Sequence, residues 1–396
     1  MKIAILGGAG LMGAGIARDL LSERAIIDVT ALRLCDNSDE RLQRVASSLA
    51  DPRIETLRLD VTEPSALAQA LRGTQLCINS VPTLAGHQMT IFEAALAARI
   101  PYLDLGGLGT YTVKQLKEHA RFVAAGVTAV LGVGSDPGMS NVICRAVANE
   151  LDEIDRINLY WAAELSGEES PILCPPYNVA TVLAEYAHPS TQFLDGRHVE
   201  CAPQSGREFI DLPAPWGRCE FMHSAHSEPL TVPLAAGIRE KGIREFTWKL
   251  HLPHREHEAW VGLVKAGFGE FENPLSVRGA TIRPVDFLAA LIERNMQRNA
   301  ARIPVQQTHE IHFAIGRGRR NGKPAVVRCE VIIRPDPMYD GYVDAGTSMN
   351  ASIAAQLLLA SPQRPGVYAP ESYFDDVSRY FRELERRHFS VRTTQE

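Results

Sequence analysis

The sequence predicts an α/β protein with a doubly wound parallel sheet at its N-terminus and a second α+β domain that contains a mixed or antiparallel sheet. A glycine-rich turn directly after the first apolar run, and a strand–helix alternation that continues to about residue 135, predict the first domain. The dipeptide Asn321-Gly322 between two long alternating runs is a strong hairpin signal and predicts an antiparallel sheet in the second.

The glycine-rich turn has the spacing Gly8-x-Gly10-x-x-Gly13 and opens a helical pattern. In a Rossmann dinucleotide-binding domain the first glycine permits the turn, the second lets the backbone approach a pyrophosphate, and the third lets the helix lie close to the strand. Free N–H groups and the helix dipole then favour the phosphates. We expect the following residues to bind the cofactor here: Gly8, Gly10, Leu11, Met12 and Gly13.

A second apolar run ends in Asp36, at the distance where this fold places the acid that binds the adenosine ribose. A carboxylate in this place repels a 2′-phosphate, so we expect NAD as the cofactor, with NADP less favoured. Arg33 and Arg41 lie close in sequence and weaken that preference. The structural alternative for Asp36 is a cap before a helix that begins near Asp39.

The first domain is predicted to have six parallel strands, at residues 2–6, 30–35, 54–59, 76–80, 102–105 and 128–131. Helical patterns separate them at 40–50, 65–72, 89–98 and 113–125. Ligands of such a sheet gather at the carboxyl ends of its strands. We therefore expect Asp60 or Val61 beside the adenine, Asn79, Ser80 and Val81 beside the nicotinamide ribose, and Asp104 at the reaction centre.

A dense turn at residues 132–141 ends this pattern, and a helix predicted at 142–151 leads into the second domain. Alternating runs predict its strands at 154–163, 243–252, 309–315 and 325–333, and helices are predicted at 179–187, 256–266 and 285–297. A helix at 347–359, a turn segment at 362–370 and a charged C-terminal helix follow. We divide the chain into a dinucleotide-binding domain (1–135), a substrate-binding and dimerisation domain (136–346), and a C-terminal helical segment (347–396) that packs back on the first domain.

Composition argues against several classes of function. A net charge of −6 over 396 residues gives no basic field for nucleic acid. Apolar runs stay short of a membrane span and a strand follows Met1 without a signal peptide, so we expect a cytoplasmic protein with no membrane partner. The seven cysteines are scattered without a CxxC pair, which argues against a disulfide framework or a zinc site.

Four segments together carry a family resemblance: 8–13, Tyr102-Leu103-Asp104-Leu105-Gly106-Gly107, Asp136-Pro137-Gly138-Met139, and 366–371. In these the chain resembles the saccharopine dehydrogenase-like family over nearly its whole length, and within it the bacterial L-lysine 6-dehydrogenases. The resemblance implies a nicotinamide cofactor and oxidation or reduction at a carbon that bears nitrogen, in amino acids or polyamines. Two features depart from the lysine 6-dehydrogenases: the stretch 223–230, and Asp136, which looks more like the saccharopine reductase form.

Oxidation of an amine to an imine needs a hydride acceptor and a base. Five of the twelve histidines lie between 223 and 257, and His223 is the best candidate for the base or a substrate contact. By resemblance, Tyr177 and Asn178 match a pair that faces the cleft, although Asn178 is also suited to cap a helix. The candidate catalytic residues are therefore His223, Tyr177 and Asp104, and the candidate substrate ligands are Asn178, Glu228, Arg239 and Arg244. The histidine clusters at 254–257 and 309–312 lack the HExxH spacing, so no metal is expected.

Three functions stay open. The first is NAD-dependent oxidative deamination of a side-chain amine, with lysine as the expected substrate. The second is reductive condensation of an amine with an oxo acid, which gives a saccharopine-, opine- or carboxynorspermidine-like product, and the third is a non-catalytic NAD(H)-binding relative. The segment 174–231 has three arginines, fewer than a product with two carboxylates requires, which modestly favours deamination. We expect a small-molecule amine partner and a homodimer or homotetramer.

Overall fold

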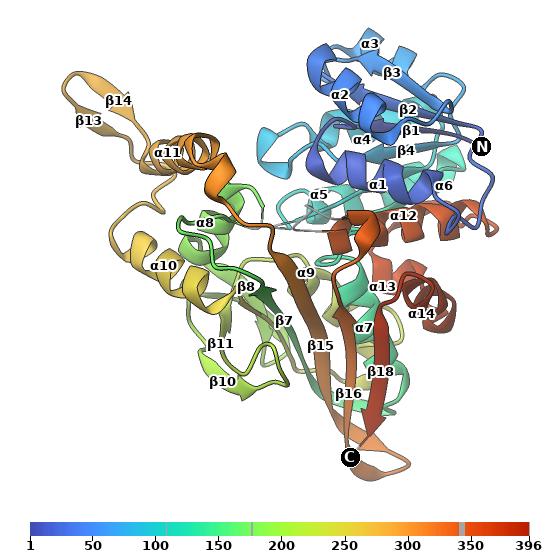
Figure 1. Ribbon diagram of the computed structural model, residues 1–396. Helices are drawn as coiled ribbons and strands as arrows, with labels where there is room; N and C mark the ends of the chain where they lie inside the picture. Colours follow the sequence, from blue (N-terminus) through green and yellow to red (C-terminus); the bar gives the residue numbers. More distant parts are fainter. Residues whose placement is uncertain (108, 176, 340–344, 396) are drawn as a thin grey trace.

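The computed structural model describes residues 1–107, 109–175, 177–339 and 345–395, arranged around two sheets (Figure 1). The first sheet has seven parallel strands in the order β17-β6-β5-β4-β1-β2-β3. Its strands are β1 (Lys2–Leu6), β2 (Ala31–Asp36), β3 (Ile54–Arg58), β4 (Leu76–Asn79), β5 (Tyr102–Asp104), β6 (Thr128–Val130) and β17 (Gly366–Tyr368). The predicted doubly wound sheet is confirmed, and β17 adds a seventh strand where the sequence predicted a turn.

The helices of this domain follow the predicted alternation, with one difference. They are α1 (Leu11–Leu21), α2 (Asp39–Leu49), α3 (Pro64–Leu71), α4 (Gln88–Ala98), α5 (Thr112–Leu116) and α6 (His119–Ala125). The single helix predicted at 113–125 is thus split into α5 and α6. The break places His119 against β17, where its Nδ1 accepts a hydrogen bond of 3.2 Å from the Val367 N–H.

The second sheet is mixed, as predicted, with the order β10-β11-β12-β7-β15-β16-β18 and with β8 and β9 branching from β12. Only β7 and β12 are parallel neighbours among the described strands of this sheet. At the β15–β16 turn Asn321 and Gly322 have φ of 50° and 73°, as the hairpin signal requires. The strands are β7 (Glu153–Ser166), β8 (Ser190–Leu194), β9 (Arg197–Cys201), β10 (Glu208–Asp211), β11 (Arg218–His223), β12 (Glu245–His251), β15 (Gln307–Arg320), β16 (Lys323–Ile333) and β18 (Ser390–Gln395).

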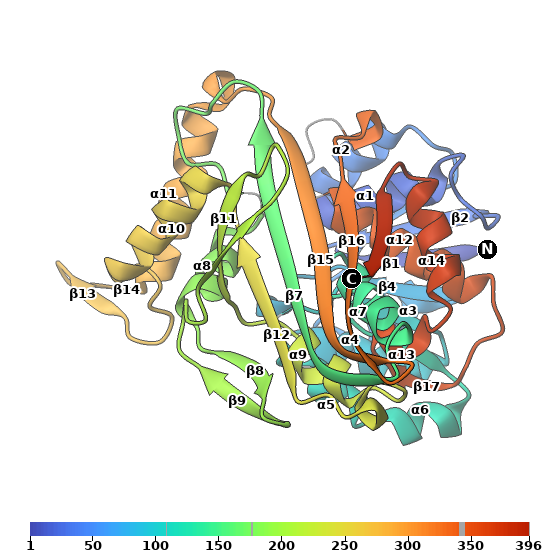
Figure 2. The same ribbon diagram turned by 90° about the horizontal axis from the view of Figure 1, so that it is seen from below.

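Helices flank this second sheet. The buried helix α7 (Met139–Asn149) packs on β7, β15 and β16. Figure 2 shows α8 (Val179–Ala187), α10 (His254–Lys265) and α11 (Pro284–Arg298) grouped on the side away from the C-terminal helices. A small hairpin of β13 (Leu275–Val277) and β14 (Ala280–Ile282) projects beyond them, and α9 (Glu228–Thr231) follows β11. No helix in the described part of the chain is long and apolar enough to cross a bilayer.

The C-terminal residues join both sheets. The helix α12 (Ala345–Leu359) packs along α1, β17 extends the first sheet, and β18 closes the edge of the second beside β16. The short helix α13 (Pro370–Tyr373) packs against α7, and α14 (Val377–Glu385) packs against α7 and α12. The segment predicted as helical therefore also contains two strands.

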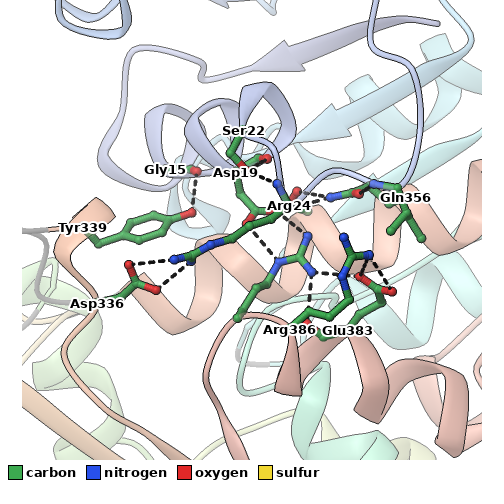
Figure 3. A network of polar contacts seen from close by, with 12 residues as sticks. Gly15, Asp19, Ser22, Arg24, Asp336, Tyr339, Gln356, Glu383 and Arg386 are labelled. Carbon is green, nitrogen blue, oxygen red and sulfur yellow. Dashed lines mark hydrogen bonds and ion pairs between the residues drawn. The ribbon is translucent and has the colours of Figure 1, made fainter.

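A polar network fixes these C-terminal elements on α1 (Figure 3). Arg387 donates to both carboxylate oxygens of Asp19, at 2.9 and 2.7 Å, and neither side chain is exposed to solvent. Gln356 on α12 also donates to Asp19, at 3.2 Å. Nearby, Arg24 pairs with Asp336 at 2.6 Å, which links the end of α1 to the chain beyond β16.

Candidate functional site

A cleft of about 770 Å³ lies between the two sheets. The loops that follow β1, β2, β3 and β4 line it from the first domain, as expected for the carboxyl edge of a parallel sheet. The second domain contributes residues of β7, β12, β15, α8 and α11. The cleft thus joins the expected cofactor site to a surface of the second domain.

The glycine-rich turn presents backbone to one end of this cleft. Gly10, Leu11 and Met12 line it, and no side chain caps the N-terminus of α1. The first-turn N–H groups of a helix have no partner within it, so they are free to bind phosphate oxygens. The turn residue with positive φ is Gly7, at 77°, and it lines the cleft.

Gly8 and Gly13 lie beneath this surface and are needed for packing. A Cβ on Gly13 would lie 2.4 Å from the Gly7 carbonyl oxygen, and one on Gly8 would lie 3.0 Å from Leu34. The predicted role of Gly13, close contact between helix and strand, agrees with this geometry. Gly8 does not supply the special turn conformation, contrary to the prediction, because Gly7 does.

Asp36 lies at the adenosine end of the cleft. Arg41 donates to its Oδ1 at 2.8 Å, and both residues line the cleft together with Asp60 and Val61. Ser38, not Asp36, caps α2 through its side chain. Arg33 faces elsewhere, with its guanidinium on Glu55 and on backbone carbonyls. Asp36 and Arg41 therefore lie together on the wall of the cleft, where the sequence predicts the adenosine ribose.

Of the predicted residues at the ends of β4 and β5, some line the cleft and others are buried behind it. Ser80 and Val81 line the cleft, whereas Asn79 is buried and accepts from the Val81 N–H at 3.1 Å. Asp104 is 1% exposed and accepts hydrogen bonds from Gln115, Tyr102 and the backbone N–H groups of 106 and 132. Burial raises its pKa. Asp104 lies outside the lining of the cleft and holds the loops at 106 and 132 behind it, so its predicted catalytic role stays a prediction.

Three more predicted residues lie away from the cleft. His223 ends β11 and contacts Ser205, and burial, followed by the charge of Lys249, lowers its pKa to about 4. Arg239 and Arg244 are exposed, outside the cleft lining. The structure therefore does not bring His223 and the two arginines to the cleft, and their predicted roles as base and substrate ligands gain no support from its lining.

His226, three residues after His223, is the histidine that the second domain presents to the cleft. Its ring stacks on Trp248 with centroids 4.2 Å apart, and its Nδ1 lies 2.5 Å from Glu228. Glu228 is fully buried and also accepts from Ser140 Oγ at 2.7 Å. Burial lowers the pKa of His226, but the charge and hydrogen bond of Glu228 raise it further, to about 8. Glu228, predicted to bind substrate, lies outside the lining of the cleft and contacts His226, which lines it.

A second buried group lies beside the cleft, around Asp136 and Glu310, which line it. His312 is held between Asp136, with Nδ1 to Oδ2 at 2.8 Å, and Glu310, with Nε2 to Oε2 at 3.3 Å. Burial lowers the pKa of His312, but Asp136 and then Glu310 raise it to about 10. Trp161 donates to Glu310 at 3.1 Å. The other oxygen of Asp136, Oδ1, is buried and has no hydrogen-bond partner among the described residues, and Asp136 lines the cleft.

Tyr177 and Asn178 do line the cleft. The Tyr177 hydroxyl donates to Glu185, which is buried and also faces the cleft. Asn178 caps α8 by accepting from the N–H groups of Ala180 and Thr181, at 3.0 and 3.2 Å, so the capping alternative is present as well. Its role as a substrate ligand stays a prediction.

The second-domain side of the cleft is acidic. Asp136, Glu185 and Glu310 line it, and the first two also raise the pKa of His226, which shows that these charges converge. Among the described lining residues the single arginine or lysine is Arg41, at the adenosine end. Such a surface suits a cationic group.

The sequence contained one signal for the residues that were missed. On a strand, residues two apart share a face. Glu310 and His312 on β15 share the face that meets the cleft, whereas His309 contacts Ser166. His309 and His312, three residues apart, thus point to opposite faces of β15, but the partner Asp136 is far away in sequence.

Comparisons with known proteins agree with this geometry. Residues 3–130 match the saccharopine dehydrogenase NADP binding domain, and residues 134–389 match the saccharopine dehydrogenase C-terminal domain. The chain is 23% identical over 302 residues to a carboxyaminopropylagmatine dehydrogenase of Synechocystis, with 74% of this chain and 72% of the relative covered. It is 24% identical over 317 residues to a carboxynorspermidine synthase of Vibrio alginolyticus, with 72% and 71% covered.

The fold is similar to apo saccharopine dehydrogenase (L-Glu forming) from Saccharomyces cerevisiae. The TM-score is 0.76 at 14% identity, and the match covers 100% of this chain and 99% of that one. The chain therefore belongs to the saccharopine dehydrogenase family of oxidoreductases, with an N-terminal domain that binds NAD or NADP.

Proposed function

We propose that this protein is an NAD(P)-dependent oxidoreductase that forms or cleaves the C–N bond of a carboxyalkyl polyamine, a cationic secondary amine. The physiological reaction is reductive condensation of a polyamine-like amine with an oxo acid. The observation that carries the proposal is the acidic second-domain side of the cleft, where Asp136 Oδ1 is a buried acceptor without a described partner. A substrate ammonium group would donate to this oxygen and remove the cost of leaving it unpaired.

Aromatic side chains add to this recognition. Trp161 and Tyr177 line the cleft with ring centroids 6.4 Å apart, next to Glu310 and Glu185. Aromatic faces attract ammonium groups, by about 0.5–2 kcal/mol each. Both named relatives carry polyamine-derived names, which supports the same class of substrate.

The chain supplies a proton donor and acceptor beside this surface. A nicotinamide cofactor bound along the glycine turn supplies or accepts the hydride. In the reductive direction the imidazolium of His226 would donate a proton to the imine nitrogen and the imine carbon would take up the hydride, so that the C=N bond becomes the C–N bond of a secondary amine. In the oxidative direction neutral His226 takes the proton from the amine nitrogen, and water then cleaves the imine to an amine and a carbonyl compound. Glu228 holds the ring and stabilises its charged form.

Lysine deamination, the first function expected from the sequence, is less well supported. The scarcity of cationic side chains in the described lining disfavours substrates with several carboxylates, as anticipated, but it does not separate lysine from a polyamine with one carboxylate. The unpartnered Asp136 oxygen and the row of carboxylates favour the more cationic molecule. Lysine 6-dehydrogenase activity stays a prediction that the same assay tests.

The test is formation of NADH or NADPH with carboxynorspermidine, carboxyaminopropylagmatine, L-lysine, L-ornithine and saccharopine. The reverse assay follows cofactor oxidation when a diamine or agmatine is supplied with an oxo acid. We expect kcat/KM for the polyamine-derived compounds to exceed that for lysine by at least about 10-fold, a difference of about 1.4 kcal/mol. Turnover of lysine alone would instead establish the deaminase.

A substitution at Asp136 tests the recognition step. Asp136→Asn keeps the shape but removes the charge, and we expect KM for the cationic amine to rise about 10-fold or more, since a hydrogen bond to a charged group contributes about 1.5–3 kcal/mol. The affinity for NAD(P) should not change. The control is Glu330→Gln on β16, a carboxylate that pairs with Arg328 outside the cleft. Equal KM values for the cationic amine in Asp136→Asn and Glu330→Gln would contradict the proposed contact between Asp136 and the ammonium group.

Cofactor choice is tested at Asp36 and Arg41. We propose that NAD is preferred, because the Asp36 carboxylate binds a ribose and repels a 2′-phosphate. Asp36→Ala frees Arg41 from its 2.8 Å pair, so we expect the NAD/NADP ratio of kcat/KM to fall about 10–100-fold. In the double variant Asp36→Ala/Arg41→Ala, the increase in kcat/KM with NADP that Asp36→Ala produces should be lost. A wild-type enzyme that prefers NADP, or an unchanged ratio in Asp36→Ala, would contradict the assignment.

A further inference from the structure

A cluster of metal-ligand side chains lies in the second domain, away from the cleft described above. Cys219 on β11, His251 at the end of β12 and His254 at the start of α10 bring their ligand atoms within 4.8 Å of one another. Cys219 and His251 are buried, whereas His254 is exposed and lines a second cavity of about 460 Å³. None of the three lines the first cleft.

The hydrogen bonds of the two imidazoles leave a pair of nitrogens facing each other. His251 Nδ1 lies 3.0 Å from the carbonyl oxygen of Glu220, and His254 Nε2 lies 3.0 Å from that of Trp216. A carbonyl oxygen only accepts, so both of these nitrogens donate. A neutral imidazole has one N–H, so His251 Nε2 and His254 Nδ1, 3.0 Å apart, would present two lone pairs to each other.

This contact is repulsive unless a cation lies between the two nitrogens. A single proton would satisfy the two imidazoles and would leave the Cys219 thiol on the Trp216 carbonyl oxygen, 3.6 Å from its Sγ. A metal ion uses all three groups, and the two carbonyl contacts are then the outer-shell bonds that orient metal-bound histidines. Two nitrogens 3.0 Å apart can both lie at the Zn–N bond length of about 2.0–2.1 Å from one ion.

We propose that Cys219, His251 and His254 form a zinc site, which the scattered cysteines and the histidine spacing in the sequence did not indicate. A thiolate with two imidazoles is a ligand set typical of zinc. A water molecule would take the fourth position of the tetrahedron, and it can enter from the second cavity, which the exposed His254 lines. The ion ties β11, β12 and α10 together, so its role is to stabilise the second domain.

Metal content of the full-length protein, purified without a histidine tag, tests the site. After incubation with zinc and gel filtration we expect one zinc per chain. We expect cobalt substitution to give a thiolate-to-metal charge-transfer band that Cys219→Ser abolishes. His254→Ala, a change at an exposed side chain that the fold tolerates, should weaken zinc binding by more than the roughly 10–100-fold typical of outer-shell changes. Chelation should lower the Tm of the wild type but not that of His254→Ala.

Two matched variants serve as controls. Cys201→Ser and His188→Ala alter the same residue types in the second domain outside the cluster, and both should keep one zinc per chain. Wild-type protein that retains no zinc overturns the proposal. Full zinc retention by folded His254→Ala and Cys219→Ser overturns it as well, because binding would then lie elsewhere.

Discussion

His226→Gln will lower kcat about 10²–10⁴-fold in both directions, the range typical for loss of a positioned acid or base, while NAD(P) affinity is retained. Glutamine keeps a polar side chain of similar length beside Trp248 but cannot exchange a proton near neutral pH. The measurement is steady-state kinetics together with cofactor binding followed by fluorescence. His223→Gln, a change at a buried histidine outside the cleft, is the matched control and should keep most of the activity.

The mechanism predicts opposite pH dependences for the reductive and the oxidative reaction. Since the pKa of His226 is raised to about 8, the imidazolium predominates below pH 8 and the neutral ring above it. Reductive turnover needs the charged ring, so it should fall as the pH rises through about 8, whereas amine oxidation should rise over the same range. Glu228→Gln removes the group that raises the pKa, so both inflections should move to lower pH. Unchanged inflections in Glu228→Gln, or wild-type turnover in His226→Gln, would rule out His226 as the acid and base.

The cofactor half of this site was predictable because its signals are local. Gly10, Leu11, Met12 and Asp36 lie within two strands and one helix, and their spacing alone fixes them at the carboxyl edge of the parallel sheet. The strand–helix alternation likewise located six strands. It missed the edge strand β17, because prolines at 362, 365 and 370 flank its three residues and such prolines are typical of turns.

The substrate half depends on contacts between distant segments. Asp136 meets His312 only because α7 and β15 pack together, and no spacing in the sequence records that contact. The choice between His223 and His226 is decided where β11 ends: His223 still pairs with Lys249 in the sheet, and the chain then turns to place His226 on Trp248 in the cleft. Composition placed histidines in the right segment but could not select among them.

Packing of the C-terminal segment on the first domain also depends on contacts between distant segments. Among these contacts, we expect substitution in the pair of Arg387 and Asp19 to cost the most stability. Arg387→Ala leaves the Asp19 carboxylate fully buried with only Gln356 as a described side-chain partner, so we expect a loss of about 3–5 kcal/mol of unfolding free energy. Urea denaturation of the wild type and the variant, with the unfolding free energy taken from the first unfolding transition, measures this loss.

The neighbouring Arg386 provides the matched control for that measurement. Its side chain is 45% exposed and pairs with Glu383, so Arg386→Ala should cost no more than about 1 kcal/mol. The double variant Asp19→Leu/Arg387→Met removes both buried charges and should recover much of the lost stability, because well-packed apolar side chains often replace a buried ion pair without loss. Equal stability of Arg387→Ala and Arg386→Ala would show that apolar packing of α12 on α1, and not the ion pair, holds the C-terminal segment on the nucleotide-binding domain.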